Sequence, residues 1–372
     1  LIHAPGLNVM YGDASGNIAW WASAKLPVRP PHVEGKFFLQ GWTDNDEILG
    51  WYPFEENPMS VNPPEGYVIS ANNQPDTMAA GVLYPGYYYP GDRYYRIAKA
   101  LKAENDFTIE KLKAVQTESI NETQAKIAQE LLSHTRKNEF ENYVEVLNKL
   151  ANWQGTHQLN EAAPVLYYKW LFHVLKLMME DQLGEEAFHA FLDTHLKARS
   201  LYRMIVTGES PWWDNKHTPQ VETPTDIINE ALKIAIEELE DELGKPSKWK
   251  WKKAVVSVHR HPLGAKKPLD RIFNVTTSPV EANAEAVNKL AFVLNGEGKY
   301  EVKSGPAMRI LLDFNDIENS LSILPTGQSG NVFSKHYTDQ AEMFVNYQYR
   351  KQMMNEEEIR STAKARLLFL RE

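Results

Sequence analysis

Two adjacent asparagines follow a short apolar segment, in a position that suits chemistry. Tyr67-Val68-Ile69 is strand-like, and Ser70-Ala71-Asn72-Asn73-Gln74-Pro75 comes directly after it. The pattern Asn-Asn-x-Pro favours turns and left-handed backbone conformations. An Asn amide held at the end of a strand can also donate a hydrogen bond to an oxygen that becomes negative during a reaction. From the residues alone, a polar turn and a functional amide both stay open.

A tyrosine-rich stretch comes next. It reads Tyr84-Pro85-Gly86-Tyr87-Tyr88-Tyr89-Pro90-Gly91-Asp92-Arg93-Tyr94-Tyr95-Arg96-Ile97. Its apolar residues lack the periodicity of a core element, yet it holds more tyrosines than a plain solvated loop. Because tyrosine combines an apolar ring with a polar hydroxyl, the wall of a binding cleft is about as well supported as a surface loop.

Two other groups of residues have the types that catalysis uses. His259-Arg260-His261 places two imidazoles on one face of a strand, where they could bind zinc with His336 as a third ligand. No carboxylate adjoins this pair at motif spacing, and Pro262 and Gly264 favour a structural corner. The run Gly327-Gln328-Ser329-Gly330 is typical of a tight turn, because nothing in the sequence marks its serine as activated.

The elements that would position these residues fall into three regions. Residues 1–100 are rich in Gly, Pro, Asn and aromatic residues, and the pattern predicts a β-hairpin with strands at 7–11 and 17–21. Residues 101–253 are predicted to be helical. Thr108 is expected to cap a helix that runs through Val115, and Thr223 one that ends at Gly244. Residues 139–152 and 164–198 have the same helical character.

Strand patterns return in residues 254–372. We expect strands at 254–258, 272–275 and 308–312, and a last helix over 337–353. Strand-rich ends around a helical middle predict an α+β chain whose two ends pair in one sheet.

Composition excludes several classes of protein. The chain has 372 residues, no cysteine and a formal net charge of −9. Thiol catalysis, zinc fingers and disulfide frameworks are therefore excluded, and the acidic balance argues against a nucleic-acid partner. The lysine-rich run 248–253 is interpreted as a solvated face over packed Trp249 and Trp251. No apolar run approaches the roughly 18 residues of a membrane span.

Read together, segments along the whole chain resemble the penicillin acylase (penicillin amidase) family of N-terminal-nucleophile hydrolases. The matching stretches are 11–18 (YGDASGNI), 50–58 (GWYPFEENP), 62–67 (NPPEGY), 71–75 (ANNQP), the run from Asp92-Arg93 to Arg96-Ile97, 261–264 (HPLG), 305–309 (GPAMR), 325–330 (PTGQSG) and 334–337 (SKHY). Their order and spacing make the resemblance specific. Residues 37–42 (FFLQGW) depart from the Pro-rich form expected before Gly50.

The resemblance implies part of an αββα sandwich with an inserted helical region. It also implies a precursor that cuts itself into a small α chain and a large β chain, whose first residue, a serine, is the nucleophile and carries the α-amino base. Leu1 would lie inside the β chain. The expected partners are therefore the missing α chain and the N-terminal part of the β chain, and this chain alone is expected to be inactive.

The family also implies a small acylated amide as substrate, such as a β-lactam with an acyl side chain or an acyl-homoserine lactone. It implies a periplasmic or extracellular location. No cofactor is required for the chemistry. The intact enzyme of this family can hold a structural calcium ion, but its carboxylate ligands lie largely outside these residues and none is matched here, so no metal ligand is assigned.

Two site residues carry over by position. Asn72 resembles the oxyanion-hole asparagine, whose NH₂ group would donate to the tetrahedral intermediate. Arg93 resembles the arginine that braces the site, and a guanidinium there would help to keep the terminal amine unprotonated. The alternative for Arg93 is a surface ion pair with Asp92.

Two other classes of function stay open on the sequence. The first is a non-catalytic, aromatic-rich protein that binds glycans or peptides. The second is a zinc hydrolase that uses the histidines. A glycan-binding protein would keep its affinity in this chain alone, and a zinc hydrolase would contain stoichiometric metal.

Overall fold

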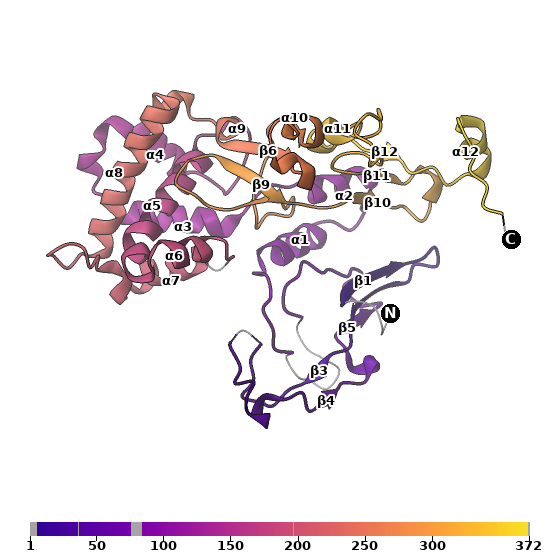
Figure 1. Ribbon diagram of the computed structural model, residues 1–372, viewed down its shortest axis with the longest axis horizontal. Helices are drawn as coiled ribbons and strands as arrows, with labels where there is room; N and C mark the ends of the chain where they lie inside the picture. The colour runs from indigo at the N-terminus through magenta and orange to yellow at the C-terminus, as the bar shows by residue number, and fades with distance from the viewer. Residues whose placement is uncertain (1–5, 36, 76–83, 196, 371–372) are drawn as a thin grey trace. The chain divides into compact units, whose positions relative to one another are not determined.

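The structure is a computed structural model that describes residues 6–35, 37–75, 84–195 and 197–370 (Figure 1). The chain divides into two compact units, Leu1–Phe107 and Thr108–Glu372. Each unit is considered by itself below.

The described residues of the first unit form short antiparallel strands and a helix. Strands β1 (Leu7–Gly12), β2 (Ile18–Ser23) and β5 (Met59–Val61) form a three-stranded sheet in the order β1-β2-β5, and β3 (Pro27–Val28) pairs with β4 (Gly50–Trp51). Short 3₁₀ turns lie at Asp44–Asp46 and Phe54–Glu56, and helix α1 covers Asp92–Lys102. The predicted hairpin is therefore confirmed, with strands that begin and end within one or two residues of the expected bounds.

The hairpin turn is held by one aspartate. The Oδ1 atom of Asp13 accepts hydrogen bonds from the backbone N–H groups of Ser15 at 2.9 Å and Asn17 at 3.0 Å. Gly16 follows with φ of +85°, a conformation that glycine adopts without steric cost. These bonds fix the register in which Met10 faces Trp20.

The second unit contains the long helices. They are α2 (Ile109–Gln116), α3 (Glu122–Ser133), α4 (Val144–Ala151), α5 (Ala163–Leu183), α6 (Glu185–Leu192), α7 (Lys197–Thr207) and α8 (Pro224–Leu243). Shorter helices are α9 (Trp251–Ala254), α10 (Asp270–Phe273), α11 (Ala341–Val345) and α12 (Glu356–Thr362). Both predicted caps are present: Thr108 accepts from Lys111 N–H, and Thr223 forms a capping box with Asp226.

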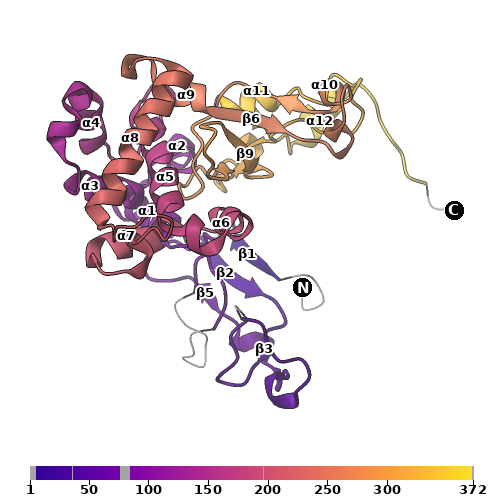
Figure 2. The ribbon, with the colours of Figure 1, turned by 60° about the vertical axis from the view of Figure 1, so that its left-hand side comes forward.

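Helices α5 and α8 form the centre of the core and run side by side (Figure 1 and Figure 2). The indole N–H of Trp170 on α5 donates to the carbonyl oxygen of Ile228 on α8 at 2.9 Å. Lys169, which is fully buried, places its Nζ atom 2.7 Å from a carboxylate oxygen of Glu238 and 2.7 Å from one of Glu242. A buried ammonium of this kind is tolerated because both carboxylates pair with it.

A second polar network surrounds His157, which contacts Tyr168 of α5. The fully buried His157 has its Nδ1 atom 3.0 Å from the carbonyl oxygen of Gly155 and its Nε2 atom 3.0 Å from the Tyr168 hydroxyl. Burial lowers the pKa of His157 from 6.5 to about 4, so the imidazole is neutral at physiological pH. Gly155, with φ of +81°, brings its backbone against that of Asn121.

Two small sheets follow the helices. One has the order β7-β6-β9-β8, with β6 (Val255–His259), β7 (Val275–Thr276), β8 (Ala291–Phe292) and β9 (Tyr300–Ser304). The other has the order β10-β11-β12, with β10 (Arg309–Leu311), β11 (Leu321–Ile323) and β12 (Arg350–Lys351). The 3₁₀ turns of this unit are Lys137–Glu139, Glu141–Tyr143, Pro211–Trp213, Pro246–Lys248, Pro262–Ala265 and Ile317–Asn319.

The structure corrects two expectations about the C-terminal region. Residues 270–273 form α10, so the strand expected at 272–275 is reduced to β7. The helix expected over 337–353 is only α11, because Tyr347 has φ of +57° and cannot continue a right-handed helix. Within the described residues, strands of 7–61 hydrogen-bond to one another, and so do strands of 255–351. The pairing of the two ends in one sheet stays a prediction.

The lysine-rich run has the structure expected of a solvated face. Trp249 and Trp251 are buried, while Lys248, Lys252 and Lys253 are exposed. In the part of the chain that the structure describes, no helix combines the length and apolar character needed to cross a bilayer.

Candidate active site

Asn72 stands at a strained backbone position, and residues 67–69 before it form no strand, contrary to the strand-like pattern of their sequence. Its φ is +62°, in the left-handed region that asparagine enters more readily than most residues. Its carbonyl oxygen accepts a hydrogen bond from the backbone N–H of Tyr89 at 3.0 Å. Non-glycine residues in this region persist only where their surroundings hold them, and such residues are common at functional sites.

Arg93 fixes the orientation of the Asn72 amide. Its Nη2 atom donates to Oδ1 of Asn72 at 2.8 Å and to the carbonyl oxygen of Ala71 at 2.6 Å. Because Oδ1 is the acceptor, Nδ2 carries the two amide hydrogens on the other branch of the side chain. Within the described residues Nδ2 donates no hydrogen bond, so this NH₂ group is available to a ligand.

Local sequence explains how Arg93 comes to this place. Gly91 is the N-cap of α1, and Asp92 puts an acidic side chain in the first turn, near the positive end of the helix dipole. Arg93 follows in the same turn. Its guanidinium carbon lies 5.2 Å from the centre of the Tyr89 ring, in a cation–π arrangement. Tyr89 therefore contacts both halves of the pair, Asn72 through its backbone and Arg93 through its ring.

Asn72 opens into a pocket of about 280 Å³. The lining residues are Gly6, Leu7, Asn8, Trp20, Ala22, Ala24, Leu26, Pro58, Asn72, Asn73, Pro75, Tyr84 and Tyr88. Most of these side chains are apolar or aromatic, with a few polar groups among them, which is the usual character of a small-molecule site.

The tyrosines of this pocket are wall residues. The Tyr84 hydroxyl donates to the carbonyl oxygen of Pro27 at 3.3 Å, and that of Tyr88 donates to the carbonyl oxygen of Tyr84 at 3.2 Å. Burial raises the pKa of both phenols above the usual value, so they stay protonated and cannot serve as bases near neutral pH. Of the two alternatives for the tyrosine-rich stretch, the wall of a cleft applies to Tyr84 and Tyr88, which line this pocket.

Two of the three histidine candidates, His261 and His336, lie in structural contacts. The Nδ1 atom of His261 accepts from the N–H of Leu263 at 3.1 Å, and its ring stacks on Phe273 with centres 4.9 Å apart. His336 pairs with Asp339 at 2.8 Å. Among the described residues, no three metal-binding side chains gather in one place. A helix cap and a hydrogen bond account for these two imidazoles.

Ser329 also belongs to a turn. Its Oγ atom accepts a hydrogen bond from the N–H of Asn331 at 3.1 Å. A Cβ atom at Gly327 would lie 2.2 Å from the carbonyl oxygen of His336, so the glycine is required by a close backbone approach. The flanking glycines that drew attention to Ser329 thus have a packing explanation.

The structure therefore brings together Asn72 and Arg93, the two residues that the family resemblance selected. It also adds Trp20 and Tyr89, which the sequence did not single out for a role. A tryptophan in a hairpin carries no local signal of function. Tyr89 precedes α1, so the four-residue spacing within a helix does not apply to it, and no local pattern predicted its contact with Arg93.

Comparisons with known proteins identify the family of the chain. A family model described as penicillin amidase matches residues 1–361. Because this match covers nearly the whole chain, the chain belongs to the penicillin amidase family.

Individual relatives and one solved structure extend this result. The chain is 27% identical to acyl-homoserine lactone acylase QuiP of Pseudomonas syringae pv. syringae (strain B728a), over 94% of this chain and 44% of the relative. It is 24% identical to penicillin acylase 2 proenzyme of Pseudomonas sp. (strain SE83), over 90% of this chain and 42% of the relative. The chain thus spans less than half the length of these relatives.

The fold is similar to that of a thermostable penicillin G acylase from Alcaligenes faecalis. The TM-score is 0.66 at 20% sequence identity, and the match covers 99% of this chain and 68% of the other. The mixture of helices and small sheets agrees with the predicted α+β class.

Proposed function

We propose that this chain is part of an amidohydrolase that cleaves the acyl amide bond of N-acylated small molecules. β-Lactams with acyl side chains and acyl-homoserine lactones are the substrate classes that the names of its relatives suggest. The single observation that carries the proposal is the Asn72 amide, whose oxygen is held by Arg93 and whose NH₂ group is available.

In this proposal Asn72 acts on the transition state. Attack of a nucleophile on the amide carbonyl moves negative charge onto the carbonyl oxygen, and Nδ2 of Asn72 donates a hydrogen bond to it. A neutral donor that is already oriented stabilises this charge without reorganisation, and the loss of one such donor costs about 10²–10³ in kcat. Arg93 would add a positive charge close by, which disfavours protonation of a neighbouring amine.

The nucleophile is proposed to be an N-terminal serine from a part of the protein outside these 372 residues. Relatives of more than twice the matched length, one of them named a proenzyme, support this view. The whole protein would then be an αββα hydrolase that matures by self-cleavage in the periplasm or outside the cell. Its α chain and the rest of its β chain would be the partners of this chain, which alone would be inactive.

The experiment compares variants of Asn72 in the whole precursor. Asn72→Gly removes the amide but keeps a residue that accepts positive φ, whereas Asn72→Ala also strains the backbone. On correctly cleaved enzyme, both should lose about two to three orders of magnitude in kcat with little change in KM. Chromogenic acyl amides report the rates, and mass spectrometry of the chains verifies cleavage.

Asn45→Ala is the control, because Asn45 is an exposed asparagine of the same unit. It should keep the activity of the unmodified enzyme. A loss below about tenfold in both Asn72 variants, with the chains correctly cut, would return Asn72 to the role of a turn residue.

A further inference from the structure

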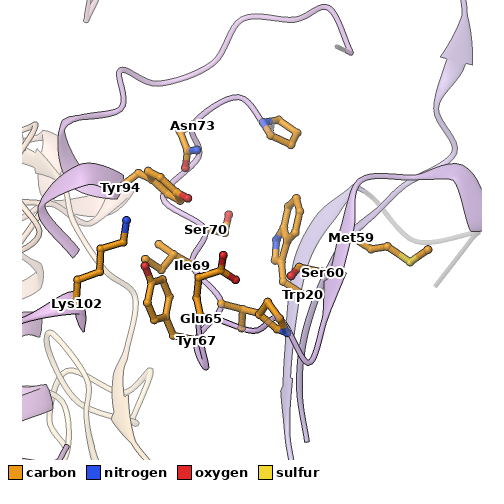
Figure 3. Close-up of a pocket in the computed structure, with 13 residues that line it drawn as sticks. Trp20, Met59, Ser60, Glu65, Tyr67, Ile69, Ser70, Asn73, Tyr94 and Lys102 are labelled. Atoms are coloured by element: carbon orange, nitrogen blue, oxygen red, sulfur yellow. The ribbon is translucent and has the colours of Figure 1, made fainter. Parts of the chain in front are cut away.

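A second pocket lies in the first unit, next to the one that contains Asn72. Its volume is about 400 Å³, within the range of sites for small molecules. The lining residues are Trp20, Met59, Ser60, Pro63, Glu65, Tyr67, Val68, Ile69, Ser70, Asn73, Pro75, Tyr94 and Lys102 (Figure 3). Neither the histidines nor the Asn72–Arg93 pair takes part in it.

Two opposite charges line this pocket without pairing. Glu65 and Lys102 form no ion pair with each other or with any other described residue. Figure 3 shows the Glu65 carboxylate near the middle of the lining residues, and Lys102 reaching in from α1 on the far side of Tyr67. Each charge is therefore free to bind a group of opposite sign on the same ligand.

Aromatic rings and hydroxyl groups complete the wall. Trp20 is held in place by a hydrogen bond of 3.0 Å from its indole N–H to Oδ1 of Asn8. Its ring and those of Tyr67 and Tyr94 offer apolar faces to a ligand. The hydroxyls of Tyr67 and Ser70 have no hydrogen-bond partner within the described residues, which leaves two polar groups for orientation.

We propose that this pocket binds an α-amino acid with an aromatic side chain, as the zwitterion. The ammonium group would lie at Glu65, the carboxylate at Lys102, and the ring against Trp20. An amine without a carboxylate would leave Lys102 unpaired, and an acid without an amine would leave Glu65 unpaired. The inference goes beyond the proposed amide hydrolysis, because it concerns a separate pocket and needs no turnover.

The test is a ligand-observed NMR titration of the protein with three compounds. L-Phenylalanine carries both charges, phenethylamine only the ammonium and hydrocinnamate only the carboxylate. Because both charged residues are exposed, affinities of about millimolar are expected, with L-phenylalanine bound about fivefold more tightly than either analogue. Equal binding of the three compounds, or binding of none, would overturn the proposal.

Two variants assign each charge to its partner. Glu65→Gln should weaken the binding of L-phenylalanine and of phenethylamine by about fivefold and leave the binding of hydrocinnamate unchanged. Lys102→Met should weaken the binding of L-phenylalanine and of hydrocinnamate by about fivefold and leave the binding of phenethylamine unchanged. Glu55→Gln and Lys126→Met are controls, because both residues are exposed and lie outside the pocket. Changes within about twofold in both test variants, with near-ultraviolet circular dichroism unaltered, would refute the assignment.

Discussion

Arg93 and Asn72 are joined by a hydrogen bond of 2.8 Å from Nη2 to Oδ1. This bond decides which end of the Asn72 amide faces outward, because a guanidinium can only donate and so must meet the oxygen. The same nitrogen also contacts the carbonyl oxygen of Ala71 at 2.6 Å, which ties the side chain and the preceding peptide together. The NH₂ group is thereby oriented before any substrate arrives.

The first prediction concerns Arg93 in the whole enzyme. Arg93→Met frees the Asn72 amide to rotate, so kcat should fall by about tenfold to a hundredfold while KM changes little. It also removes a positive charge. On the proposed mechanism the pKa of the catalytic amine would then rise, and the acidic limb of the kcat/KM profile would move to higher pH.

Arg93→Lys is the matched variant, because it keeps the charge but loses the planar guanidinium. It should retain the original acidic limb and still show a lower kcat. Steady-state kinetics across pH on both variants measure the two effects separately. An acidic limb that stays in place in Arg93→Met would remove the electrostatic role of this residue.

Tyr89 is predicted to be a positioning residue. Tyr89→Leu keeps the backbone N–H that binds Asn72 but removes the ring beside Arg93. A cation–π contact contributes about 0.5–1 kcal/mol at exposed sites, so a fall in kcat of about two- to fivefold is expected. Tyr89→Phe keeps the ring and should restore kcat. If Phe and Leu variants behave alike, the ring has no part in positioning.

The buried His157 predicts a pH dependence of stability. Its pKa is lowered from 6.5 to about 4 by burial, so on acidification the unfolded chain takes up a proton before the folded chain does. Stability is therefore lost as pH falls through this window. Between about pH 7 and pH 5 the loss due to this group should be about 2 kcal/mol.

Urea unfolding at both pH values measures this loss of unfolding free energy. His157→Gln removes the titrating group, so the difference between the two pH values should shrink by about 2 kcal/mol. His217→Gln, at an exposed histidine of the same unit, should leave the difference unchanged. An unaltered difference in His157→Gln would show that other groups cause the acid sensitivity.

Alanine substitutions at two glycines distinguish the cost of backbone strain from the cost of steric overlap. Both Gly155 and Gly208 have positive φ, at +81° and +66°. A Cβ atom at Gly155 would lie 1.9 Å from the carbonyl oxygen of Asn121, whereas at Gly208 nothing lies within 4 Å. Gly208→Ala should cost about 1–2 kcal/mol and Gly155→Ala about 3 kcal/mol or more in unfolding free energy. Similar costs in thermal or urea unfolding would contradict the calculated overlap.

Helix caps and turns were predicted well from nearby residues, whereas the end of α11 depends on tertiary contacts and was not predicted. Thr108, Thr223 and the turn at Asp13 act through neighbours a few residues away, so their sequence context is sufficient. Tyr347 ends α11 with a left-handed backbone while its hydroxyl bonds to Asn288 and Glu281, far away in sequence. The apolar pattern of residues 337–353 could not predict these contacts.

In the two pockets, too, some residues were predicted from the sequence and others are brought together only by the fold. Asn72 and Arg93 were selected because their motifs resemble a family, and the structure places them in contact. Glu65 and Lys102 were not selected, because exposed charges on a loop and a helix end carry no pattern. Only the fold brings them to one pocket.

Trp20, Asn73 and Pro75 line both pockets of the first unit. A ligand that displaced this shared wall from one side would alter the space on the other, and binding in the two pockets would then be thermodynamically linked. Such linkage is reciprocal: the factor by which a ligand beside Glu65 and Lys102 changed the affinity at Asn72 would equal the factor by which a ligand at Asn72 changed the affinity beside Glu65 and Lys102. Through this shared wall, the concentration of a ligand of one pocket would then change the apparent affinity of the other pocket for its own ligand.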